Sequence, residues 1–150
     1  MMLRAAIPAI LALFAAGTAF ADQASGDSLK DTDLTGQWVF KSWTYDGCEF
    51  GGTTHLSRQA DSNIYDCELV ANQVCPSVTW RVRQSCVARQ SGGQLVINST
   101  IEEFLEGEPT DSYWPDNFIL TIRSPNRMNG SLLSHGVHAS EFRRDEGGIS

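Results

Sequence analysis

Lysine and arginine are scarce in this sequence: 11 of its 150 residues carry them, against 18 aspartates and glutamates. The formal net charge is therefore −7 at neutral pH. A chain this acidic is a poor candidate for binding nucleic acid unless its few cations gather on one face. The negative charge favours solubility and, by long-range attraction, cationic partners.

Long hydrophobic runs are confined to the first 21 residues. Arg4 precedes an almost wholly apolar stretch at 5–16, and residues 19–21 (AFA) have the small-x-small spacing of a signal-peptidase site. The apolar stretch is short for a membrane span. We therefore predict a cleaved signal peptide at 1–21 and a periplasmic or secreted protein with no transmembrane segment in the mature chain.

Motifs that carry catalytic chemistry are missing. There is no nucleophile elbow, zinc-protease helix, phosphate-binding loop or dinucleotide fingerprint. Of the three histidines, His55 stands alone, and the spacing of His135 and His138 on a strand or turn points them apart. We therefore expect a protein that is not an enzyme and has neither a metal nor a cofactor.

Helical periodicity is missing too, and alternation with a period of two replaces it. Residues 79–89 (TWRVRQSCVAR) show it best, with one face made of Trp80, Val82, Cys86 and Ala88 and with Gln84 as a polar exception. Similar strands are expected at 36–40, 65–71, 94–104, 117–124, 127–133 and 137–144, with an eighth at 53–58. Turn residues, including the pair Gly51-Gly52, separate these runs.

Seven or eight short strands with hairpin-length connections predict an all-β fold, an antiparallel meander that closes into a small barrel or folds over as a sandwich. Closure is favoured because it removes exposed sheet edges. We assign the barrel to residues 34–145, a flexible polar arm to 22–33 and a flexible tail to 146–150.

Four cysteines remain after export: Cys48, Cys67, Cys75 and Cys86. An even number in an exported chain predicts two disulfides, and the spacings do not match zinc knuckles. A hairpin that turns at residues 76–77 sets Cys67 opposite Cys86, which favours this pair and leaves Cys48 for Cys75. Three connectivities exist, and the sequence alone does not choose among them.

The motif Gly36-x-Trp38 on the first strand resembles the start of lipocalin and calycin barrels. In those proteins the tryptophan closes one end of the barrel and an arginine of the last strand packs across it, a role that Arg143 or Arg144 would take here. The lipocalin T-D-Y motif and C-terminal helix are absent from this sequence.

The opening L-x-G-x-W also resembles that of bacterial alkaline-protease inhibitors, which are small exported barrels whose N-terminal arm enters the protease cleft. The arm at 22–33 would correspond to it. Four cysteines are two more than this resemblance leads us to expect.

Several surface residues are candidates for binding. Arg81 and Arg83 form a stripe on the outer face of one strand, and Tyr113 and Trp114 lie on a loop that either lines a ligand entrance or plugs the barrel. The acidic run at 102–111 is expected to be a solvated loop that attracts a basic partner.

These features indicate an exported binding protein. The first hypothesis is a small apolar ligand inside the barrel, which requires an open interior. The alternatives are a protein-binding module, such as a periplasmic protease inhibitor that uses the arm or the loop at 111–117, and a structural envelope protein. A filled barrel together with an essential arm would favour the protein-binding module.

Overall fold

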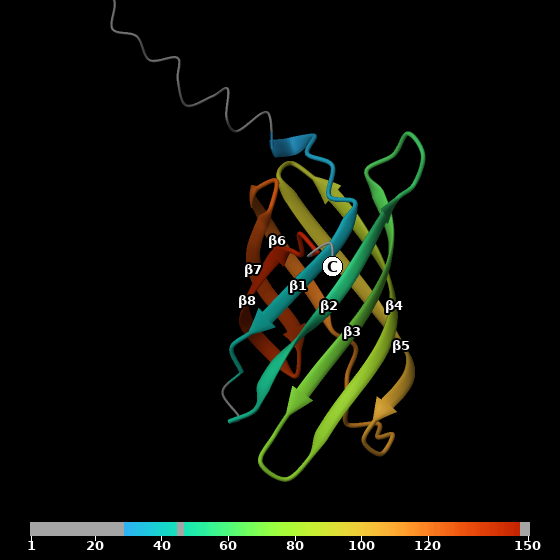
Figure 1. Ribbon diagram of the computed structural model, residues 1–150, viewed down its shortest axis with the longest axis vertical. Helices are drawn as coiled ribbons and strands as arrows, with labels where there is room; N and C mark the ends of the chain where they lie inside the picture. Colours follow the sequence, from blue (N-terminus) through green and yellow to red (C-terminus); the bar gives the residue numbers. More distant parts are fainter. Residues whose placement is uncertain (1–28, 45–46, 148–150) are drawn as a thin grey trace, which may run out of the picture.

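A closed antiparallel barrel contains all the strands of the computed structural model, which describes residues 29–44 and 47–147 (Figure 1). Each strand pairs with the next along the chain, and the last strand pairs with the first. The strands are β1 (Gly36–Ser42), β2 (Glu49–Arg58), β3 (Ile64–Val74), β4 (Thr79–Ser91), β5 (Gln94–Glu106), β6 (Asn117–Ser124), β7 (Arg127–Ser134) and β8 (Gly136–Arg144). The all-β meander barrel is confirmed, and the eighth strand expected at 53–58 belongs to β2.

Several predicted segments fall wholly or partly outside the described residues: the signal peptide (1–21), the first part of the arm (22–28) and the end of the tail (148–150). Within the described part of the chain, no helix is long and apolar enough to span a membrane.

Alternating side chains fill the barrel. On β4 the inward positions Val82, Gln84, Cys86 and Ala88 are buried. At the centre, the Phe40 ring contacts the rings of Phe50, Phe118 and Phe142 at centroid distances of 6.1, 5.3 and 5.1 Å. We call these four residues the aromatic cluster. An eight-stranded barrel is only just wide enough to be filled by side chains, so the cluster leaves little interior room.

The pair Gly51-Gly52 lies inside β2 rather than at a turn, so that prediction was wrong. Gly52 pairs with Phe40 across the sheet. A Cβ at Gly52 would lie 2.0 Å from the Val70 carbonyl oxygen and 2.9 Å from the Phe40 ring. Glycine is therefore used here because the barrel wall passes close to a large ring.

Both disulfides have the favoured pairing, Cys48–Cys75 and Cys67–Cys86. The second joins residues that are directly opposite in the β3–β4 ladder, as the hairpin turn predicted. The first ties the start of β2 to the end of β3. Together they brace the first half of the barrel, each contributing roughly 2–4 kcal/mol.

One end of the barrel is closed by Trp38 and Arg144, and we call it the lid end. Trp38 is fully buried, and the Arg144 guanidinium carbon lies 4.6 Å from the centroid of its ring. Arg144 also donates hydrogen bonds to the carbonyls of Thr35 at 2.6 Å, Asp33 at 3.0 Å and Pro125 at 3.0 and 3.1 Å. The arginine thus joins three separate segments over the tryptophan.

Gly36 leaves room for this arginine. Its φ angle of 128° lies in the region that favours glycine, and a Cβ there would lie 3.0 Å from Arg144 Nη1. Arg143, the other candidate, instead points away from the barrel: its side chain is 70% exposed and pairs with Glu141 at 2.5 Å.

Residues 29–33, the last part of the predicted arm, are seated on the lid end. Leu29 packs against the core, and the Gln90 amide donates to the carbonyls of Lys30 and Thr32 at 3.1 and 3.0 Å. These five are the described residues of the predicted arm at 22–33, which itself stays a prediction. Their apolar contact and satisfied carbonyls fix them to the barrel.

We predict that Arg144→Met lowers the free energy of unfolding by about 2 kcal/mol, because a buried ring and several carbonyls lose a charged donor. Arg143→Met, a matched change on the neighbouring exposed residue, should stay within about 0.5 kcal/mol of the wild type. Urea denaturation with the disulfides intact measures both. Equal losses in the two variants would contradict a closing role for Arg144.

Candidate functional site

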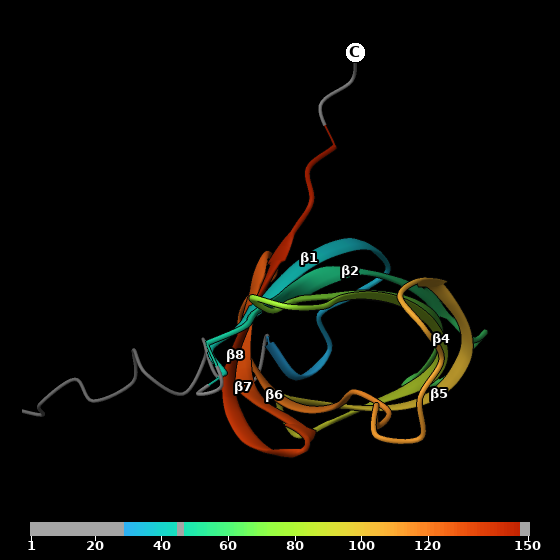
Figure 2. The same cartoon turned by 90° about the horizontal axis from the view of Figure 1, so that it is seen from below.

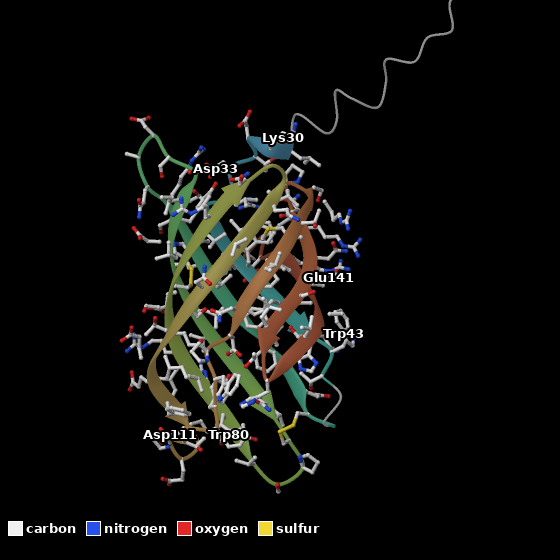
Figure 3. The ribbon with its side chains drawn as sticks, turned by 180° about the vertical axis from the view of Figure 1, so that it is seen from behind. Lys30, Asp33, Trp43, Trp80, Asp111 and Glu141 are labelled. Carbon is white, nitrogen blue, oxygen red and sulfur yellow. A yellow bond between two sulfur atoms is a disulfide. The ribbon has the colours of Figure 1, made fainter. Side chains whose placement is uncertain are left out.

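A hollow of about 180 Å³ opens at the end of the barrel opposite the lid, and we call it the mouth. Figure 3 places Trp80 and Asp111 at this end and Lys30 and Asp33 at the other, and Figure 2 views the barrel from the mouth side. Strand ends, the β5–β6 loop and the β7–β8 turn supply its walls, which are Gln73, Trp80, Ser112, Tyr113, Trp114, Ser134 and His135.

A second hollow of about 140 Å³ adjoins the mouth and shares Gln73, Ser134 and His135 with it. His138 also borders this hollow, so the two histidines that were expected to point apart line one space. Phe50 of the aromatic cluster forms another part of its wall. Among the described residues no group of three or more His, Cys, Asp or Glu side chains is placed to hold a metal ion.

The β5–β6 loop is fixed across the mouth by contacts with two other elements. The His135 ring lies 4.5 Å from the Trp114 ring, and its Nε2 hydrogen-bonds to the Ser112 carbonyl. On the other side, Trp80 Nε1 donates to the Glu108 carbonyl at 3.2 Å. These contacts hold the aromatic walls in place before any ligand arrives, which lowers the entropic cost of binding.

A buried polar network lies behind the wall. Asp116, only 1% exposed, accepts hydrogen bonds at Oδ2 from the Gln84 amide at 2.5 Å and from the Tyr113 hydroxyl at 2.9 Å. Its backbone N–H donates to Gln84 Oε1 at 3.0 Å. The other carboxylate oxygen, Oδ1, is buried without a hydrogen-bond partner among the described residues. A buried acceptor left in this state is costly and unusual in a native structure.

Burial raises the pKa of Asp116 to about 6, against the lowering effect of hydrogen bonds from Gln84, Tyr113 and Ser134 and of the nearby His135. The Ser134 hydroxyl also lies within hydrogen-bond distance of the Trp114 carbonyl, at 3.4 Å. Burial, and then the charge of Asp116, raise the pKa of Tyr113. Tyr113 therefore stays protonated and donates to the carboxylate.

The predicted binding residues separate into two groups. Tyr113 and Trp114 both line the mouth, the first nearly buried at 8% exposure and the second 53% exposed. Arg81 and Arg83 lie on the outer face of β4, and Arg83 pairs there with Glu103 at 3.1 Å. This exposed pair contributes little to stability, and the arginine stripe takes no part in the mouth.

Asp116 was missed in the sequence, although a signal pointed to it. Gln84 stood out as a polar side chain on a buried face, and a buried amide requires a polar partner. The sequence does not show which residue comes opposite, because Asp116 lies 32 positions away and reaches Gln84 only when the β5–β6 loop folds back.

No protein-family model matches the chain, and no curated protein matches it. Among solved structures it is similar to a redesigned β-barrel, with a TM-score of 0.55, 14% identity and coverage of 81% of this chain and 96% of the other. It is also similar to the redesigned β-barrel mFAP1 bound to DFHBI, with a TM-score of 0.53, 16% identity and coverage of 80% and 98%. At these identities the likeness establishes the barrel fold alone.

We predict that Asp116→Asn changes how stability depends on pH. The raised pKa means that the folded state holds the proton more tightly, so the wild type loses stability as the pH rises from about 4 through about 6. The asparagine does not ionise. The free energy of unfolding of Asp116→Asn, relative to that of the wild type, should therefore rise by on the order of 2 kcal/mol between about pH 4 and about pH 6 and then level off.

Urea denaturation at several pH values measures this difference. Asp61→Asn is the matched control, because Asp61 is exposed and its φ of 53° suits asparagine. It should show no such trend. A difference between Asp116→Asn and the wild type that stays constant over the window would contradict the raised pKa.

Proposed function

We propose that this protein is an exported, non-enzymatic binding protein that holds a small molecule in the mouth of its barrel. The observation that carries the proposal is the hollow of about 180 Å³ whose walls include Trp80, Tyr113 and Trp114. Binding sites of this kind combine an apolar or aromatic lining with a few fixed polar groups. Here the polar groups include the Gln73 amide and the Ser134 hydroxyl.

We place the ligand at the mouth and not in the barrel interior, where the first hypothesis placed it. An apolar ligand enclosed in the barrel would need the space that the aromatic cluster occupies, where Phe40 stacks on Phe142 at 5.1 Å. Phe118 and Phe142, like Trp38 at the lid end, are fully buried. The open space therefore begins on the mouth side of Phe50, where the two hollows lie.

The size of the mouth limits its ligand. Pockets for drug-sized molecules enclose roughly 300–1,000 Å³, whereas this hollow has about 180 Å³. A group of a few heavy atoms fits, either as a whole ligand or as one end of a longer one. The similar barrel mFAP1 is described as bound to DFHBI, which supports small-molecule binding as a use of this fold.

Protease inhibition through the arm has less support. Residues 29–33 are held at the lid end, far along the barrel from the mouth, and residues 22–28 lie outside the described residues. The loop at 111–117 is tied to His135 and lines the hollow rather than standing free.

We predict that native mass spectrometry of the protein, purified gently from its own host, finds a small mass excess that denaturation releases. Trp114→Ala removes an aromatic wall and should lower the bound fraction several-fold. Val39→Ala, a truncation on the exposed outer face of β1, should leave it unchanged.

A bare mass in the wild-type protein, with both disulfides formed, would count against the proposal. Equal occupancy in the Trp114 variant and the wild type would place the ligand elsewhere.

A further inference from the structure

We propose that the mouth binds a small organic cation, of the class of quaternary or alkylated ammonium groups. The inference rests on the proposed function and adds the chemistry of the ligand. Three independent features of the described residues point to it: the aromatic walls, the buried carboxylate behind them and the distribution of charge between the two ends of the barrel.

The aromatic walls suit a positive charge. The faces of aromatic rings carry negative potential, and several rings around one space form a cage for alkylated ammonium ions. Trp80 and Tyr113 meet edge to face at 6.2 Å, and Trp114 stands on the same loop as Tyr113. Among the residues that the structure describes, no lysine or arginine lines either hollow, whereas His135 lines both.

The buried carboxylate lies one layer behind this wall. Tyr113, which faces the mouth, donates a hydrogen bond from its hydroxyl to Asp116 Oδ2 at 2.9 Å. Asp116 Oδ1 has no hydrogen-bond partner in the described part of the chain. The nearby His135 and the hydrogen bonds to the carboxyl offset its burial only in part, since the pKa of Asp116 stays raised. An anionic ligand would be repelled at this position, and a neutral one would add no compensation. A cation would offset the cost of burying it.

Charge is also divided between the ends of the barrel. The segments that form the mouth end (42–44, 47–50, 73–81, 106–116 and 132–138) contain five carboxylates and one arginine. Those at the lid end (29–36, 58–64, 89–94, 123–127 and 143–147) contain seven lysines and arginines and five carboxylates. The mouth is therefore the negative end, which steers cations towards it.

The test compares choline with its neutral isostere 3,3-dimethylbutan-1-ol, which has the same shape and hydroxyl group without the charge. Titration of the full protein at neutral pH and low salt, followed by tryptophan fluorescence and by NMR shifts at the mouth, should show choline binding about tenfold tighter or more. Equal affinity would overturn the cation inference and leave a small-molecule site at the mouth. Absence of choline binding at millimolar concentration would overturn the inference as well.

Two variants test whether the Asp116 carboxylate is the charge that strengthens choline binding. Asp116→Asn should weaken choline binding about tenfold and leave the neutral isostere unaffected. Asp61→Asn removes the same charge at the lid end and should change neither. If Asp116→Asn fails to fold, as near-ultraviolet circular dichroism would show, the exposed pair Glu108→Gln and Asp111→Asn replaces it. That double variant should weaken choline binding a few-fold and flatten its salt dependence.

Unchanged choline affinity in a folded Asp116→Asn protein, or in the double variant, would contradict the role assigned to the negative mouth.

Discussion

The limited width of an eight-stranded barrel governs the rest of this structure. Its interior is just wide enough for packed side chains or one small ligand, and here the Phe40 ring and the three phenylalanine rings that contact it occupy the centre. The wall adapts to them, since Gly52 leaves the space that the Phe40 ring requires. Because the centre is filled, space for a ligand within the barrel has to lie at an end, and the two ends have opposite characters.

The lid end is closed by satisfied polar groups. Arg144 covers Trp38 and donates to the carbonyls of three residues, Asp33, Thr35 and Pro125. The Gln90 amide fixes residues 29–33 beside it. The mouth end instead retains a buried carboxylate behind an aromatic hollow, and one of its oxygens has no hydrogen-bond partner among residues 29–44 and 47–147. Unsatisfied buried groups are costly, so proteins tend to keep them where they act on something else. This difference between the ends is the physical basis of the proposed binding site.

Much of the fold could be predicted from the sequence because it depends on short-range alternation. The inward positions of β4 and the Cys67–Cys86 pair follow from residues within one strand or one hairpin. The closing role of Trp38 was expected only from the resemblance to lipocalin barrels, because its partner Arg144 lies on the last strand. The turn predicted at Gly51-Gly52 was wrong because glycine occurs both in turns and where backbone packs close to a large side chain. Only the position of the Phe40 ring in the fold shows that the second case applies here. Asp116 was missed because its meeting with Gln84 depends on the path of the β5–β6 loop. The mouth depends on such long-range contacts, whereas most of the barrel does not.

The most direct test of a charged site beneath the mouth is a pH titration of the Asp116 side-chain carboxyl, followed by carbon-13 NMR. A buried carboxyl with one unpartnered oxygen should titrate with a midpoint near pH 6, well above the usual 3.8. A midpoint at or below the usual value would show a solvated or fully compensated group. It would contradict the description of the mouth as a site that lacks its positive partner.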